Sequence, residues 1–441
     1  IPVATTKIFQ FYSDIFTGIG LLKGVEVKLH IDPNAIPIQQ PIRRIPFHTR
    51  EKVSLEIDRL LKLNIIEPVT GPTTWLNPIV PVIKPSGKLR LCLDMRRANE
   101  TITRERHVIP KMEDILPDLH QATVFSKIDL REGYHQLMLH PDSRHITTFA
   151  THRGIFRYKC LIFGINSAFE CFQKHIEIVL SGCEGAKNIS DDVLIWGKDQ
   201  TEHDNNLQTV LSRIKEHGLK INKEKCLFSV NQIMFSGHKL TSQGISPDPT
   251  KVESIKKISP PTNISELKSF IGIINFCHRY IPNYSTISAP LRHLTKKNVA
   301  YSWGQEQQTS FNTLKDILTT NTVMAYYNPN AETYITVDAS PSGLGAILSQ
   351  KQQDGSIKPI SYGTRSVTET ETRYSQTERE ALGAMWCLQH FHYYVYDRHV
   401  TIYTDHKPLE VLLSSRSNPP PRIQRWLLRM QGYSYTIKYI R

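Results

Sequence analysis

Two adjacent carboxylates, Asp191 and Asp192, stand directly before an apolar run at residues 193–196. Gly185 and Asn188 come shortly before them, so this stretch predicts a turn, two acids and then a strand. Because neighbouring side chains of a strand point to opposite faces, both acids can serve one site only at the tight end of a hairpin. Carboxylates held that close repel each other unless a cation lies between them, and such oxygen ligands favour Mg²⁺. A solvated acidic turn would explain the pair without any function.

A third carboxylate, Asp129, ends a predicted strand at residues 123–130 and precedes the pair in the chain. Three converging acids could hold two Mg²⁺ ions. Such a pair of ions would lower the pKa of a primer 3′-hydroxyl and stabilise an in-line phosphoryl transfer. The carboxylates themselves would need no proton-transfer role in this chemistry, because they position the metals.

A second set of acids, Asp338, Glu380 and Asp405, follows in the last quarter of the chain. Asp338 and Asp405 each lie at the end of a predicted strand, and Glu380 lies on a predicted helix. Glu378 is the alternative on that helix. A solvated strand end would explain any one of these acids on its own.

The length of 441 residues predicts two to four domains. Lys and Arg exceed Asp and Glu by 13 charges, and the excess is spread along the chain. A spread basic excess suits a long polyanion such as nucleic acid, although solubility alone would also explain it. Seven cysteines without a C-x-x-C pair predict reduced thiols in an intracellular protein. No apolar run approaches the roughly 18 residues that span a membrane, and no signal pattern opens the chain.

Hydrophobic periodicity predicts the elements that must position these acids. The first part of the chain reads as a strand, a helix, a hairpin, a strand and two helices, at residues 25–31, 53–63, 75–93, 123–130, 167–180 and 201–217. We expect Thr201 and Asp204 to cap the last of these helices. The region beyond residue 330 reads as three strands, a helix and two strands, at residues 333–338, 343–350, 357–362, 377–391, 399–404 and 433–439. This order predicts a separate mixed α/β domain.

Several motifs then occur in the order of a known family. Residues 125–136 (FSKIDLREGYHQ) resemble the first catalytic motif of retroelement reverse transcriptases, and residues 89–99 (LRLCLDMRRAN) resemble their fingers motif. Phe163-Gly164 and residues 167–173 resemble the next block, and Asp191-Asp192 the metal-binding box. Residues 280–285 (YIPNYS) resemble the connection segment of Ty3/gypsy long-terminal-repeat retrotransposons. The chain is similar to the reverse transcriptase and ribonuclease H region of such a Pol polyprotein.

The resemblance implies an α+β fold: a right-hand polymerase of fingers, palm and thumb, then a connection segment and a mixed α/β ribonuclease H-like domain. We divide the chain into an N-terminal lead-in (1–24), fingers and palm (25–245), thumb and connection (246–325) and a C-terminally truncated ribonuclease H-like domain (326–441). The looser motif FSGH, at residues 235–238, falls where the family grips the primer.

By the same resemblance Asp129, Asp191 and Asp192 are catalytic metal ligands. Two Mg²⁺ ions are expected in each active site, and Mn²⁺ could replace them.

Lys84 and Arg90 match the cations of the fingers that bind the incoming triphosphate, a task for which the Arg fork suits phosphate oxygens. Tyr134 matches the steric gate that fills the space of a ribose 2′-hydroxyl, although a core tyrosine would have the same pattern. Phe163 and Gly164 would lie beneath the template–nucleotide pair.

Three further stretches resemble ribonuclease H motifs of the same elements: YITVDAS at 334–340, YSQTERE at 374–380 and YTDHKPL at 403–409. They imply that Asp338, Glu380 and Asp405 are catalytic metal ligands that hold two Mg²⁺ ions for cutting the RNA strand of a hybrid. The family carries a fourth acid shortly after the position where this chain ends, so we expect this chain to bind hybrid and to cut it weakly.

The expected function is RNA-directed and DNA-directed DNA polymerisation with an appended endonuclease activity. The expected partners are an RNA or DNA template, a DNA primer, RNA–DNA hybrid, dNTPs, and a flanking protease and integrase, with no membrane. We expect an intracellular location, in a cytoplasmic retroelement particle or in the nucleus.

Three departures from the family pattern are Ile189, where Tyr is usual, and Ile162 and Phe169, where Pro is usual. They motivate an alternative hypothesis, a decayed or domesticated nucleic-acid-binding protein without polymerase activity.

Overall fold

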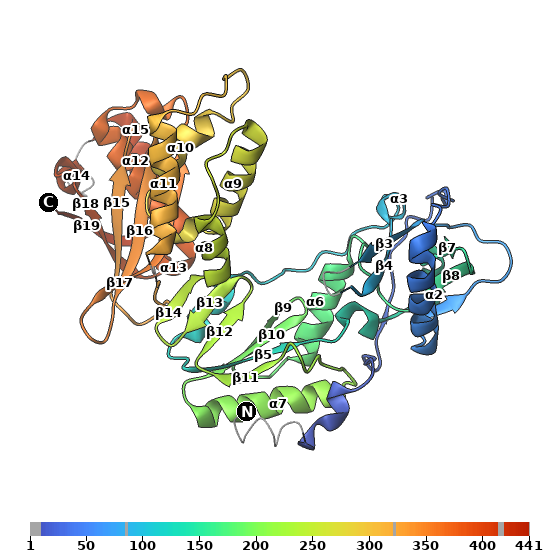
Figure 1. Ribbon diagram of the computed structural model, residues 1–441. Coiled ribbons are helices and arrows are strands. Elements are labelled where there is room, and N and C mark those ends of the chain that lie inside the picture. Colours follow the sequence, from blue (N-terminus) through green and yellow to red (C-terminus); the bar gives the residue numbers. More distant parts are fainter. Residues whose placement is uncertain (1–9, 84–86, 321–322, 413–418, 441) are drawn as a thin grey trace. The chain divides into compact units, whose positions relative to one another are not determined.

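The computed structural model describes residues 10–83, 87–320, 323–412 and 419–440, and the chain divides into two compact units. One unit runs to Ile115 and resumes over Gln121–Ile233, and the other comprises Leu116–His120 and Met234–Arg441. Figure 1 shows mixed helices and strands in both. These units do not test the finer domain boundaries given above, which stay predictions. Among the described residues, no helix is long and apolar enough to cross a membrane.

A four-stranded antiparallel sheet in the order β11-β5-β10-β9 forms the centre of the first unit. Its strands are β5 (Val124–Asp129), β9 (Ala186–Ile189), β10 (Asp192–Gly197) and β11 (Leu227–Val230). Helix α7 (Gln200–Glu216) packs against β10 and β5, and helix α6 (Ala168–Val179) packs against β9. The buried strand core explains the apolar run after Asp192, since residues 193–196 are all buried.

A long helix and three small sheets complete the first unit. Helix α2 (Phe47–Lys62) buries Val53, Ile57 and Leu60, which share one face because of their 3–4 residue spacing. The remaining strands are β1 (Glu26–Val27), β2 (Ile66–Pro68), β3 (Ile79–Ile83), β4 (Leu89–Leu93), β6 (Met138–Leu139), β7 (Phe149–Thr151) and β8 (Gly154–Tyr158). The short helices are η1 (Ser13–Phe16), α3 (Arg96–Asn99), α4 (Met112–Ile115), η3 (Gly133–Gln136), α5 (Pro141–Arg144) and η4 (His145–Thr147).

Two local predictions for this unit were wrong. The strand expected at residues 25–31 is only the two-residue β1, paired with β6, because Leu29 N–H bonds the Ser143 hydroxyl instead of a neighbouring strand. Helix α7 is capped by Asp199 rather than by Thr201, because the Asp199 carboxylate accepts a hydrogen bond from Glu202 N–H. The hairpin expected at residues 75–93 is confirmed as β3 and β4.

A three-stranded sheet, β12-β13-β14, begins at the boundary between the two units and is followed by four helices of the second unit. These elements are β12 (Gln232–Phe235), β13 (His238–Thr241), β14 (Gly244–Pro247), α8 (Pro249–Lys256), α9 (Ile264–Phe276), α10 (Tyr284–His293) and α11 (Gln305–Thr319). In the motif at residues 235–238, Phe235 and His238 are buried, and Ser236 alone is well exposed. Those two side chains therefore support the local packing.

A five-stranded sheet in the order β17-β16-β15-β18-β19 forms the rest of the second unit. Antiparallel pairs join β17, β16 and β15, and parallel pairs join β15, β18 and β19. The strands are β15 (Thr333–Ala339), β16 (Gly343–Lys351), β17 (Ile357–Ser366), β18 (His399–Thr404) and β19 (Ser434–Tyr439). The helices are α12 (Gln376–His390), α13 (His392–Val395), α14 (Pro408–Leu412) and α15 (Pro421–Met430), with the short turns η2 (Leu116–Leu119), η5 (His278–Tyr280) and η6 (Glu371–Arg373). Helix α12 packs against both β15 and α15.

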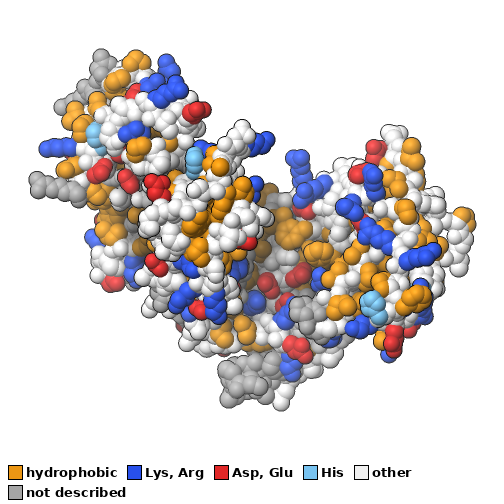
Figure 2. All heavy atoms as spheres, turned by 45° about the horizontal axis from the view of Figure 1, so that its top comes forward, with side chains coloured by type: hydrophobic (Ala, Val, Ile, Leu, Met, Phe, Trp, Pro, Cys, Tyr) orange, Lys and Arg blue, Asp and Glu red, His pale blue; other side chains and the backbone are white. Residues whose placement is uncertain are grey.

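The basic excess is distributed over the surface. Figure 2 shows Lys and Arg side chains scattered over the visible face and interspersed with Asp and Glu. A surface of this kind attracts a polyanion without concentrating the charge in one tail.

Candidate active sites

A tight hairpin end carries Asp191 and Asp192. Strands β9 and β10 are joined at Ser190, which has a left-handed backbone with φ of 57°. Its N–H donates to the buried Gln173 side chain of α6 at 2.8 Å, and Gln173 donates to Asn188 C=O at 3.0 Å. The turn breaks the strand alternation, so Asp191 lies in the turn and Asp192 begins β10. This is the geometry that two cooperating acids require.

Asp129 lies directly opposite Asp192 in the antiparallel pairing of β5 and β10. Residues opposite each other on neighbouring strands have closely spaced side chains. Burial, followed by the charges of Asp129 and Asp192, raises the pKa of Asp191 to about 6. Burial also raises the pKa of Asp192. The three carboxylates therefore share one electrostatic environment.

Two lysines partly neutralise this cluster. Lys225 Nζ lies 3.0 Å from Asp129 Oδ2, and Lys127 Nζ lies 3.9 Å from Asp192 Oδ1. In contrast, Asp191 Oδ1 is buried and makes no hydrogen bond with any described residue. An orphaned buried carboxylate oxygen beside two further acids is suited to a hard cation.

Among the described residues, no group of three or more His, Cys, Asp or Glu side chains is arranged so that it could hold a metal ion. Mg²⁺ usually takes one or two carboxylates and fills its other positions with water and substrate phosphates.

Asp191 also lines a cleft of about 580 Å³ that contains most of the expected nucleotide contacts. Arg90 of β4 is exposed in this cleft, and its guanidinium carbon lies 5.6 Å from the centre of the Phe163 ring. Gly133 is closely surrounded there, because a Cβ atom would lie 2.7 Å from Phe172 Cζ and 2.9 Å from Asp191 Oδ1. Lys84 lies outside the described residues.

The Tyr134 ring lies in the same cleft between two phenylalanines. Its centre is 5.5 Å from that of Phe163 in an edge-on arrangement and 5.1 Å from that of Phe172. Burial and the charge of Asp191 raise the pKa of Tyr134 to about 12, so it stays neutral. Gly164 has φ of 105°, a conformation that favours glycine, and its C=O accepts a hydrogen bond from Asn99 at 2.7 Å. Tyr134 is thus half-buried: its ring packs against the two phenylalanines and also lines the cleft.

Two of the three departures from the family pattern, Ile162 and Ile189, lie next to this site. Ile162 is 3% exposed and lines the cleft, and Ile189 lies opposite Asp192 in the β9–β10 pairing. Neither residue replaces a carboxylate.

The acids of the second unit also converge. Strands β15 and β18 are parallel neighbours with Val337 opposite Thr404, so Asp338 and Asp405 follow at adjacent strand ends. Glu380 of α12 is 1% exposed, and its Oε2 makes no hydrogen bond with any described residue. Burial, followed by the charges of Asp405 and Asp338, raises the pKa of Glu380 to about 7. The orphaned oxygen and the two nearby acids suit a divalent cation.

The alternative helix acid, Glu378, has a structural role. It accepts a hydrogen bond from Ser375 N–H at 2.9 Å in a capping box and pairs with Arg422. Glu380, which lacks such partners on one oxygen, is therefore the acid that faces the other two.

Sequence reasoning missed the partner of Asp338. Asn283 donates a hydrogen bond to Asp338 Oδ2 at 3.0 Å from the turn before α10, where its own φ is 49°. Its side chain lies against Gly345, where any Cβ atom would collide with Asn283 Oδ1. The YIPNYS motif contains Asn283, but nothing in its spacing indicates this contact.

Residues 82–240 match the family described as reverse transcriptase (RNA-dependent DNA polymerase), and residues 328–433 match the RNase H-like domain found in reverse transcriptase. The chain is 33% identical over 413 residues to the retrovirus-related Pol polyprotein from transposon 412 of Drosophila melanogaster. The chain therefore carries a region that matches reverse transcriptases and a region that matches their RNase H-like domain, and it is similar to retrotransposon Pol polyproteins.

The chain is also similar to other Pol polyproteins. The chain is 32% identical over 440 residues to the polyprotein from transposon opus of Drosophila melanogaster, and 28% identical over 425 residues to the Tf2-3 polyprotein of Schizosaccharomyces pombe. These three alignments cover 92–95% of this chain but only 32–44% of the relatives. The chain thus spans less than half the length of the polyproteins that it matches.

Solved structures establish the fold. A foamy viral protease-reverse transcriptase in complex with double-stranded DNA gives a TM-score of 0.87 at 23% identity, over 99% of this chain and 78% of that one. The same kind of protein in complex with RNA/DNA hybrid gives a TM-score of 0.80 at 22% identity, over 99% and 60% of the two chains. The fold is the expected polymerase followed by a ribonuclease H-like domain. Both families generally work with divalent metal ions.

Proposed function

We propose that this chain polymerises DNA on RNA and DNA templates and that its ribonuclease H-like domain cuts the RNA strand of the resulting hybrid. The observation that carries the proposal is the convergence of Asp129, at the end of β5, with Asp191 and Asp192 of the neighbouring β9–β10 hairpin. Asp191 lines the same cleft as Arg90 and Tyr134. The likeness to structures that hold DNA and hybrid supports the choice of substrate.

Each residue of the polymerase site has a role in this proposal. Asp129, Asp191 and Asp192 would hold two Mg²⁺ ions, for which Mn²⁺ could substitute. Bound ions of this kind lower the pKa of a primer 3′-hydroxyl and stabilise charge on the transferring phosphoryl group. The exposed Arg90 binds the triphosphate, with Lys84 as a second cation. Their positive charge orients the dNTP before transfer.

The other cleft residues select the nucleotide. Tyr134 is held by Phe163 and Phe172, so its ring is a fixed wall against a ribose 2′-hydroxyl. Phe163 is 60% exposed, and with Gly164 it offers a surface beneath the template–nucleotide pair. A rigid wall of this kind discriminates because a bulkier sugar cannot displace it at low cost.

In the second unit, Asp338, Glu380 and Asp405 would hold the two Mg²⁺ ions of the nuclease. The 2′-hydroxyl of RNA distinguishes the strand to be cut from DNA. We further propose that the chain works with a protease and an integrase of the same polyprotein, inside the cell, in a cytoplasmic retroelement particle or in the nucleus. Cell fractionation of the expressed element would test this location, and recovery only from the culture medium would contradict it.

Primer extension tests the polymerase proposal. The wild-type protein should incorporate dTTP on poly(rA)/oligo(dT) with Mg²⁺, and Asp191→Asn should not. Glu184→Gln is a matched control, because it removes one exposed negative charge just before the same hairpin. Asp338→Asn should leave extension unchanged and reduce hybrid cleavage. A wild-type protein that incorporates nothing, or an active Asp191→Asn variant, would refute the proposal.

The alternative function is a decayed or domesticated protein that binds hybrid without polymerising. The substitutions at Ile162, Phe169 and Ile189 favour it, and the three carboxylates argue against it. Tight hybrid binding by a wild-type protein that cannot extend a primer would support this alternative.

A further inference from the structure

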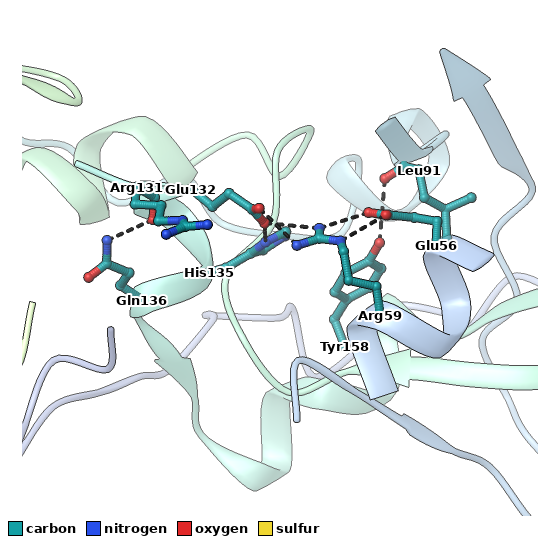
Figure 3. Close-up of polar contacts among 8 residues, drawn as sticks. All are labelled: Glu56, Arg59, Leu91, Arg131, Glu132, His135, Gln136 and Tyr158. Carbon is teal, nitrogen blue, oxygen red and sulfur yellow. Dashed lines mark hydrogen bonds and ion pairs between the residues drawn. The ribbon is translucent and has the colours of Figure 1, made fainter. Parts of the chain in front are cut away.

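An ion-pair network borders the proposed nucleotide site, and none of its members has a role so far. Figure 3 shows Glu132, from the loop after β5, facing Arg59 of helix α2. Arg59 Nη1 lies 2.9 Å from Glu132 Oε1, and Arg59 Nη2 lies 3.1 Å from Glu132 Oε2. The same guanidinium makes two 2.8 Å bonds to Glu56 on its own helix. Arg59 is therefore fully engaged between two carboxylates, each bound in the two-point geometry of an Arg fork.

The loop that Arg59 contacts has an unfavourable backbone. Glu132 has φ of 48°, in the left-handed region, where residues other than glycine carry a conformational cost of about 1 kcal/mol or more. Tyr134 follows two residues later, in the short helix η3. A conformation of this kind persists only when surrounding contacts fix it. The ion pair with Arg59 and the 3.0 Å contact between Glu132 Oε2 and His135 Nδ1 supply such contacts.

The network also reaches the strand that carries Arg90. His135 stacks on Tyr158, with ring centres 6.1 Å apart and planes 23° apart. The Tyr158 hydroxyl donates to Leu91 C=O at 3.4 Å, next to Arg90 in β4. All of these residues line the cleft that contains Asp191. Arg59 is thus connected to both walls of the proposed nucleotide site.

The positive charge of Arg59 also neutralises a carboxylate in the cleft. Glu132 keeps 36% of its side chain exposed in a cleft that must accept a triphosphate. Although burial alone would raise it, hydrogen bonds from His135 and Arg59 lower the pKa of Glu132 to about 2, so this carboxylate is ionised. Without its partner, the ionised carboxylate would repel the phosphates of an incoming nucleotide.

We propose that Arg59 is a positioning residue for the incoming nucleotide: its ion pair with Glu132 fixes the loop that carries Tyr134 and neutralises a carboxylate inside the cleft. The inference rests on the proposed polymerase function. Arg59 does not bind the triphosphate itself, since both edges of its guanidinium are taken by carboxylates. Loss of Arg59 therefore acts on nucleotide binding and on sugar selection, with little effect on the transfer step.

Single-nucleotide insertion with dTTP and with UTP tests this role in four variants: Arg59→Gln, Glu132→Gln, the double variant Arg59→Gln/Glu132→Gln, and Lys62→Ala. Lys62 is the matched control, an exposed cation on the same helix that does not line the cleft. Arg59→Gln should raise KM for dTTP roughly tenfold, leave kcat nearly unchanged and reduce discrimination against UTP. Lys62→Ala should match the wild type.

The double variant separates the mechanisms. Removing the Glu132 charge in the Arg59→Gln background should recover part of the lost nucleotide affinity, because one of the two cleft carboxylates that lose Arg59 is then uncharged, whereas Glu56 stays charged. Equal KM increases in the single and double variants would overturn the inference that Arg59 neutralises Glu132 in the cleft. Kinetics of Arg59→Gln that match those of Lys62→Ala would overturn it as well.

Hydrogen exchange gives a readout that does not depend on catalysis. In Arg59→Gln, amides of residues 130–137 should exchange faster than in the wild type, whereas those of β10 should not change. Unchanged exchange in this loop would overturn the inference while leaving the polymerase proposal intact. A wild-type protein that fails in primer extension would refute the proposed function and this inference with it, even if the loop were loosened.

Discussion

The carboxylate of Asp191 destabilises the metal-free protein, so Asp191→Asn should abolish polymerisation and yet stabilise the fold. Burial, Asp129 and Asp192 all oppose its ionised form. An acid whose pKa is raised in the folded state binds its proton more tightly there than in the unfolded chain. The cost that Asp191 adds therefore shrinks as the pH falls from about 6 towards 3.8, and above that window the full cost of its charge is present.

The size of the effect follows from the pKa shift. The pKa of Asp191 rises from 3.8 to about 6, and one pKa unit corresponds to about 1.4 kcal/mol, so the ionised group costs at most about 3 kcal/mol. Solvent screening and relaxation reduce this value, because the side chain is partly exposed. We expect Asp191→Asn to raise the free energy of unfolding of the first unit by about 1 to 3 kcal/mol at pH 7.5, and by almost nothing at pH 4.

Urea unfolding with pulsed hydrogen exchange measures this gain where it arises. Peptides that cover β5 and β10 report the first unit separately from the second, and EDTA keeps the protein free of divalent ions. Glu184→Gln, which removes an exposed charge near the same hairpin, should change the stability by less than about 0.5 kcal/mol. Saturating Mg²⁺ should stabilise the wild type and have little effect on Asp191→Asn.

Two results would refute the reasoning. A loss of stability in Asp191→Asn at pH 7.5 would mean that the carboxylate is satisfied in the metal-free fold. A gain of the same size at pH 7.5 and pH 4 would mean that packing, rather than charge, causes it.

Three further predictions concern individual side chains. Tyr134→Ala should raise incorporation of UTP relative to dTTP roughly tenfold or more, because the wall against the 2′-hydroxyl is gone; gel-based single-nucleotide insertion measures this ratio. Glu380→Gln should abolish hybrid cleavage, as measured with a labelled RNA–DNA duplex, and leave primer extension unchanged. Asn283→Ala should lower the same cleavage roughly tenfold, because it frees the Asp338 carboxylate that Asn283 orients.

Specific outcomes would contradict each of these. An unchanged sugar preference in Tyr134→Ala would make Tyr134 a packing residue only. Hybrid cleavage by Glu380→Gln at the wild-type rate would show that Glu380 is not the metal ligand on helix α12. Loss of primer extension in Asn283→Ala would show a general defect in folding rather than a local effect on Asp338.

The sequence predicted the hairpin at Asp191-Asp192 because local signals agree there. Small turn residues precede the acids and an apolar run follows them, and both follow from short-range physics. The contacts that support that hairpin could not be predicted from the sequence. Serine rarely adopts the left-handed backbone that Ser190 has here, and its partner Gln173 lies outside the hairpin, on helix α6. The sequence thus shows which residues could form the turn, but a tertiary contact determines which residue adopts the left-handed conformation.

The contacts that fix the Tyr134 loop and that orient Asp338 could not be predicted from the sequence either. Arg59 and Glu132 are 73 residues apart, and Asn283 and Asp338 are 55 residues apart. Any of the 54 basic side chains could pair with Glu132 as far as composition is concerned. The failure of the strand predicted at residues 25–31 has the same origin, because alternation predicts a half-buried strand but a neighbour must exist to pair with it.

Asp191 and Glu380 reveal a shared physical design in two unrelated folds. Each has one buried carboxylate oxygen without a hydrogen bond. Burial and two neighbouring acids raise the pKa of Asp191 to about 6 and that of Glu380 to about 7. In both sets the companion acids lie at strand ends, where the backbone is fixed by the sheet. A rigid sheet prevents these acids from moving apart, so their repulsion is relieved only by a proton or a cation. Binding of divalent ions and stability of the fold are therefore linked in both units, and metal removal should loosen the β9–β10 hairpin and the first turn of α12 before the strands that support them.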